Sequence, residues 1–129
     1  MVLNLRELGG LLKDVDWRGD SREVIREWPA AVRANLGADL RRLQEGKKPT
    51  DWKPFPGLVK NAFELRAQDK DGWYRAIYVT IIKGKVTVLH CFKKASDRTE
   101  RVDVNTANQR LKELLEEARM ASRKKGRET

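Results

Sequence analysis

Hydrophobic residues recur at two different spacings along this chain, and the spacing changes near its middle. In the first third, four of them follow one another at intervals of four, four and three residues: Val32, Leu36, Leu40 and Leu43. That spacing is typical of a helix with one buried face. A shorter helix is predicted before it, over residues 20–28, and Pro29 separates the two. From residue 103 onward helical spacing returns, which predicts a last helix that carries Val104, Ala107, Leu111, Leu114, Leu115 and Ala118 on one side.

Between the helical segments, apolar and polar side chains alternate over residues 58–66, as they do in a β-strand with one buried face. Two further strands are expected at residues 73–82 and 86–92, and a short first strand can form near residues 15–17. The strands at 73–82 and 86–92 are apolar on both faces, so helices are expected to cover much of the sheet. The predicted fold is therefore α+β, with two N-terminal helices, a three- to four-stranded antiparallel sheet and a C-terminal helix. Residues 47–57 contain three prolines and are expected to form a loop.

The length of 129 residues fits a single domain. We assign residues 14–121 to that domain, residues 1–13 to an N-terminal extension and residues 122–129 to a charged tail. No apolar run approaches the roughly 20 residues of a membrane span, and the N-terminus lacks the order of a secretory signal, which predicts a cytoplasmic protein. The lone Cys91 and the absence of a Cys/His cluster predict neither a metal nor another cofactor.

The formal net charge of +9 is concentrated on the predicted sheet. Residues 47–101 hold thirteen basic and six acidic side chains, whereas residues 1–46 hold eight of each. A surplus of this kind raises the local concentration of phosphates, so nucleic acid is favoured as a partner over a role in solubility alone.

Three short segments resemble the RelE/HigB-type toxins, in particular their phage-related branch. They are the strand Tyr74-Arg75-Ala76, the strand end Leu89-His90-Cys91-Phe92-Lys93-Lys94, and Thr99-Glu100-Arg101 before the last helix. The likeness extends from Trp17 to Met120. It implies the toxin of a bacterial type II toxin–antitoxin pair, a metal-independent endoribonuclease that cleaves mRNA and depends on the ribosome. It also implies a helix-turn-helix antitoxin as partner, through which the toxin would contact DNA, and no contact with membranes.

Metal-free RNA cleavage needs fixed cations for the phosphoryl oxygens and groups that move protons. The resemblance implies Arg75 as the active-site arginine, and its guanidinium can hold two phosphate oxygens. The other catalytic candidates are Glu64, His90, Lys93 and Lys94. Strand alternation sends the two lysines to opposite faces, so only one can join Arg75. His90 shares its predicted face with Val86 and Val88, which favours a core role over a catalytic one.

Further side chains are candidates for holding the RNA strand. Phosphates could be held by Arg66, Arg98 and Arg101, and unstacked bases by Trp52, Trp73 and Tyr74. Glu64 and Arg66 project together from the polar face of their strand. Glu64 is either a base, the partner that orients Arg75, or simply the ion-pair partner of a structural arginine.

Two other functional classes remain open: a non-catalytic RNA-binding module similar to double-stranded-RNA-binding domains, and a phage-related interaction protein. The nuclease hypothesis carries a structural requirement that separates it from both. Arg75 must be exposed at the centre of an open, positively charged sheet. If Arg75 were covered by a helix and paired with an acidic neighbour, RNA could not reach it, and the nuclease hypothesis would have to be abandoned.

Overall fold

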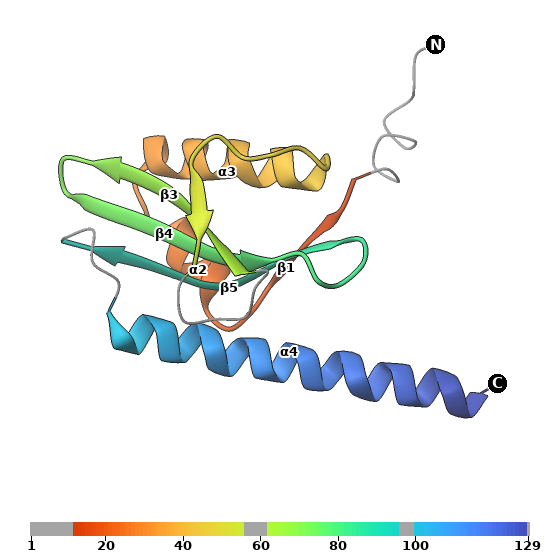
Figure 1. Ribbon diagram of the computed structural model, residues 1–129. Helices are drawn as coiled ribbons and strands as arrows, with labels where there is room; N and C mark the ends of the chain where they lie inside the picture. The colour runs from red at the N-terminus through yellow and green to blue at the C-terminus, as the bar shows by residue number, and fades with distance from the viewer. Residues whose placement is uncertain (1–11, 56–61, 96–99, 129) are drawn as a thin grey trace, which may run out of the picture.

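The computed structural model describes residues 12–55, 62–95 and 100–128. Within these ranges the chain forms one sheet with helices on both faces (Figure 1). The first eleven residues of the predicted extension lie outside them. In chain order the elements are β1 (Asp14–Trp17), α2 (Ser21–Arg26), α3 (Ala30–Gln44), β2 (Trp52–Pro54), β3 (Ala62–Asp69), β4 (Gly72–Val79), β5 (Lys85–Lys94) and α4 (Arg101–Glu128).

The sheet has five strands in the order β1-β5-β4-β3-β2. The predicted α+β class is confirmed, but the sheet is mixed because β1 runs parallel to β5 while the other pairs are antiparallel. The fifth strand, β2, lies in the segment expected to be a loop. A proline cannot donate to a neighbouring strand, yet Pro54 is tolerated here because β2 forms the edge of the sheet.

Two hydrophobic cores separate the sheet from its helices (Figure 1). The α3-side core contains the predicted helical stripe together with strand residues Leu65, Tyr74, Ala76, Tyr78, Val86, Val88 and Cys91. The α4-side core joins Ala107, Leu111 and Leu114 of α4 to Ala62, Ile77, Val79, Leu89 and Phe92. Helices therefore cover both faces, as the apolar character of the central strands predicted.

The last helix continues to Glu128, so residues 122–128 of the predicted tail belong to α4. Its buried residues end at Leu114, and the residues from Arg119 to Gly126 are all exposed. Figure 1 shows this part of α4 running past the sheet.

A β-bulge in β5 changes which face its side chains occupy. Ile77 pairs with His90 and Tyr78 pairs with Val88, which leaves Leu89 as the extra residue. An extra residue reverses the alternation beyond it. Val86 and Val88 consequently lie in the α3-side core, whereas Leu89 and Phe92 lie in the α4-side core.

Candidate nucleic-acid interface

The face of the sheet that looks toward α4 gathers five charged side chains from four strands. Directly opposed pairs place Lys53 beside Glu64 and Arg66 beside Arg75. Lys94 belongs to the same face because its Nζ lies 5.5 Å from the ring centre of Phe92, a residue of the α4-side core. We call this set, Lys53, Glu64, Arg66, Arg75 and Lys94, the charged cluster. It holds four cations and one carboxylate, and the sequence predicted correctly that Glu64 and Arg66 share a face.

Arg75 is fully buried, with 0% of its surface exposed. Its Nε lies 3.2 Å from Oε1 of Glu64, which is equally buried, and its Nη1 donates a hydrogen bond to the Tyr74 carbonyl at 3.3 Å. Trp73 covers it further, with the guanidinium 5.3 Å from the indole centre. The expectation that Arg75 is exposed was therefore wrong. The ion pair with Glu64, the structural alternative, is what the structure contains, and RNA cannot reach this guanidinium as it stands.

Glu64 cannot act as an accessible base in this arrangement. A second cation approaches the same oxygen, Nζ of Lys53 at 3.3 Å from Oε1. Neither carboxylate oxygen accepts a well-directed hydrogen bond from the described residues, so the charge is balanced mainly by ion pairing. The Lys53 side chain is 36% exposed and links this buried group to solvent.

The two lysines that end β5 lie on opposite faces, as alternation predicted. Lys94 shares the face of Arg75 and is buried, with 7% of its surface exposed. Lys93 is exposed on the other face, and its Nζ lies 5.4 Å from the ring centre of Tyr74. The lysine aligned with Arg75 is therefore the buried one, and the exposed one points away from the cluster.

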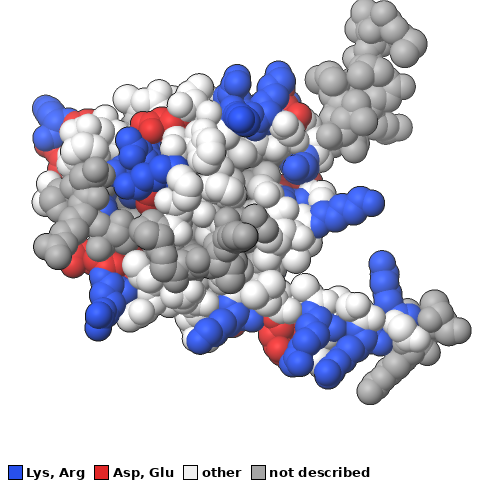
Figure 2. Space-filling model, in the orientation of Figure 1, with Lys and Arg blue, Asp and Glu red and all other residues white. Residues whose placement is uncertain are grey.

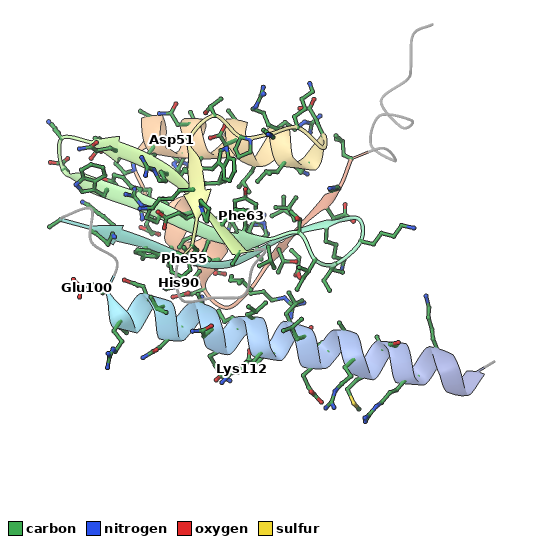
Figure 3. All side chains as sticks on the ribbon, viewed as in Figure 1. Asp51, Phe55, Phe63, His90, Glu100 and Lys112 are labelled. Carbon is green, nitrogen blue, oxygen red and sulfur yellow. The ribbon has the colours of Figure 1, made fainter. Side chains whose placement is uncertain are left out.

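His90 lies between β5 and α4 (Figure 3). The bulge places it on the α4 side, so the predicted face shared with Val86 and Val88 was wrong. Nε2 is 2.8 Å from Oδ1 of Asp103, and Nδ1 is 3.4 Å from Nη1 of Arg110. A neutral imidazole with its proton on Nε2 satisfies both contacts, donating to the carboxylate and accepting from the guanidinium. With both nitrogens engaged, His90 joins α4 to the sheet and has no free nitrogen for a substrate.

Arg110 extends this junction to the N-terminal part of the chain. It donates to the Leu89 carbonyl and to Oδ1 of Asp20, both at 2.9 Å. Asp20 precedes α2 without capping it through its side chain. Sequence reasoning missed Asp103 and Arg110, since nothing in a helical pattern tells which polar residue meets a strand.

The RNA-holding candidates have different surroundings. Arg66 is partly exposed and pairs with Asp51 at 3.0 Å, and Trp73 is partly exposed. Tyr74 is 1% exposed and its hydroxyl donates to Asp69, so its assignment as a base-stacking residue was wrong. Arg101 is exposed at the start of α4, and Arg98 lies outside the described residues.

Among the charged side chains visible in Figure 2, basic ones cover more surface than acidic ones, over α3, near the edge of the sheet and along α4. No group of three or more metal-binding side chains occurs in the described part of the chain. No helix among the described residues is long and apolar enough to cross a membrane.

Comparisons with known proteins identify a family and a fold. A family model described as "Phage derived protein Gp49-like (DUF891)" matches residues 23–112. A solved structure of a mutant E. coli toxin RelE in the free state superposes with a TM-score of 0.53, at 19% identity, covering 75% of this chain and 94% of that chain. No curated protein sequence matches.

Proposed function

Because the chain belongs to the phage-derived Gp49-like family and shares the RelE fold, we propose that it is the toxin of a type II toxin–antitoxin pair. The solved structure that shares this fold is that of a toxin, E. coli RelE. The resemblance of the β4 and β5 segments to RelE/HigB-type toxins supports the same role.

The proposed target is mRNA, bound while it occupies the ribosome. The observation that carries this step is the charged cluster, in which four cations share one face of the sheet with one carboxylate. Lys53 and Arg66 expose part of this charge, and Arg101 adds a cation at the start of α4. Fixed cations of this kind attract the phosphate backbone whatever the sequence of the message. Because mRNA on ribosomes is a cytoplasmic target, the proposed location of the protein is the cytoplasm.

The burial of Arg75 against Glu64 removes the exposed nuclease site that the sequence predicted. Cleavage of the bound message is therefore proposed only for a second conformation, in which Arg75, Glu64 and Lys94 are exposed to RNA. His90 has no part in this step, because both of its nitrogens join α4 to the sheet. In the arrangement described, Arg75 does not contact phosphate, because its side chain is buried.

The same burial favours a second candidate, a toxin that binds RNA without cutting it. This second candidate does not have the fold of a double-stranded-RNA-binding domain. The chain has a five-stranded mixed sheet with a parallel β1–β5 pair, and it shares the fold of RelE. The two candidates share the cation-rich surface and differ only in whether the message is broken.

The proposed partner is a helix-turn-helix antitoxin that neutralises the toxin and carries it to operator DNA. Its net charge should be opposite to the +9 of this chain. A gene for such a protein beside this one would support the pairing.

Induced expression with primer-extension mapping of cellular messages tests the proposal. Growth arrest with new 5′ ends in translated messages is expected, and cleavage by purified protein and assembled ribosomes should not require an added metal. The matched control is Lys112→Gln, which removes an exposed lysine of α4 and should remain toxic. Arrest without new ends would select the non-cutting candidate, and normal growth at a normal protein level would contradict both.

A further inference from the structure

A second surface, on the opposite face of the sheet, is built to hold an apolar ring beside an anion. A groove of about 200 Å³ opens between the end of α3 and the edge strand β2. Its floor is formed by Leu43, Phe63 and Tyr78, and its wall is Trp52. Lys47 and Lys48 form the rim. None of the residues of the charged cluster lines it.

Trp52 packs against a neighbouring ring and remains partly exposed to solvent. Its ring packs edge-to-face on Phe63, with ring centres 5.5 Å apart and planes at 75°. The residue is still 39% exposed, although it is one of the largest apolar side chains of the protein. An indole that packs on one neighbour and keeps this much of its surface exposed can accept a second flat ring by stacking.

The rim supplies positive charge. Lys47 pairs with Glu45 at 3.1 Å, whereas Lys48 makes no ion pair among the described residues. The Lys48 carbonyl accepts a hydrogen bond of 2.7 Å from Nε of Arg42, which fixes the backbone of the rim. Residues 41–53 carry five basic and two acidic side chains, so the surroundings of the groove are basic as well.

The edge strand connects this groove to the charged cluster. Trp52 is paired with Leu65 of the α3-side core, and the next residue, Lys53, is paired with Glu64 of the cluster. Neighbouring residues of a strand point to opposite faces. A single strand of nucleic acid that crosses the edge of the sheet at β2 would therefore meet the indole on one side and the Lys53 ammonium on the other.

We propose that this groove binds an unstacked base of single-stranded RNA, with the base on Trp52 and the adjoining phosphate at Lys48. The inference rests on the proposed RNA target and adds a binding position outside the charged cluster. An apolar floor with one stacking wall offers few hydrogen-bond partners, so the position accepts any base. A nucleotide fits better than an apolar peptide side chain because it brings a flat ring and an anion together.

The test uses fluorescence anisotropy with a labelled 12-nucleotide RNA whose 2′-oxygens are methylated, which removes the 2′-OH that cleavage needs. A matched 12-mer without bases reports phosphate binding alone. Trp52→Ala should weaken binding of the base-containing strand about 10-fold, because stacking contributes about 1–3 kcal/mol per base, and should not change binding of the abasic strand. Trp52→Phe should retain most of the affinity.

Lys48→Gln should weaken both strands and lower the salt dependence by about one phosphate contact, whereas the control Lys112→Gln should do neither. Urea unfolding of each variant checks that the fold is retained. If wild-type protein and Trp52→Ala each bound the two strands equally well, the inference would be overturned and the toxin proposal would stand. If wild-type protein bound neither strand, the groove proposal would be wrong, and the ribosome-bound target would still be decided by the primer-extension experiment.

Discussion

Replacement of Arg75 by methionine is the sharpest test of the buried ion pair. Methionine retains much of the side-chain volume and removes the charge. Among the described residues, Glu64, 0% exposed, would keep only Lys53 as its counter-ion, and the Lys53 side chain is 36% exposed. Removing one partner of a buried pair typically costs about 3–5 kcal/mol, because the remaining charge has lost its solvent and its partner.

A loss of this size corresponds to a fall in melting temperature of about 12–20 °C for a domain of this length. The assay is urea unfolding, in which the midpoint should fall while the slope with denaturant stays constant. The double variant Arg75→Met/Glu64→Leu removes both charges and should recover most of the lost stability, since apolar residues of similar volume often replace buried pairs without net cost.

A loss below about 1 kcal/mol for Arg75→Met would refute the reasoning, because it would mean that the guanidinium is solvated or unpaired in solution. A double variant as unstable as the single one would also contradict it. Growth inhibition by the double variant then separates two roles of Arg75. A stable and toxic double variant would make the arginine structural, and a stable but harmless one would show that its charge is needed for the toxic action.

Two further predictions concern buried groups elsewhere. His90→Gln should lower stability by about 1–3 kcal/mol through loss of a partner for Asp103 and Arg110, with growth inhibition unchanged; full stability with lost toxicity would instead make His90 catalytic. Burial, followed by the charge of Asp20, raises the pKa of the Cys91 thiol from 9.0 to about 12. Its contribution to stability is therefore complete below pH 9 and declines as the pH rises toward 12, because the unfolded chain loses the proton first. Urea midpoints from pH 8 to 11 should fall more steeply for wild type than for Cys91→Ala, and parallel curves would contradict this.

The sequence alone determined the class of fold and the positions of its main elements. The spacing of Val32, Leu36, Leu40 and Leu43 predicted α3, and all four are buried in the α3-side core. Alternation also placed Lys93 and Lys94 on opposite faces. These predictions succeeded because hydrophobic periodicity reflects which side of a helix or strand is removed from water, and local spacing is sufficient to show it.

The tertiary structure alone decided what the polar residues do. One extra residue, Leu89, moved His90 to the other face of the sheet, and a bulge has no signal in the hydrophobic pattern. The pairing of β1 with β5 joins residues about 70 positions apart, and β2 formed where three prolines predicted a loop. Arg75 has a clear place in its strand, but its burial and its partner depend on what packs over the sheet. The exposed fraction of a side chain depends on which helices and strands pack over it. Hydrophobic periodicity could therefore place each basic residue on its strand, but it could not predict which basic residues face solvent.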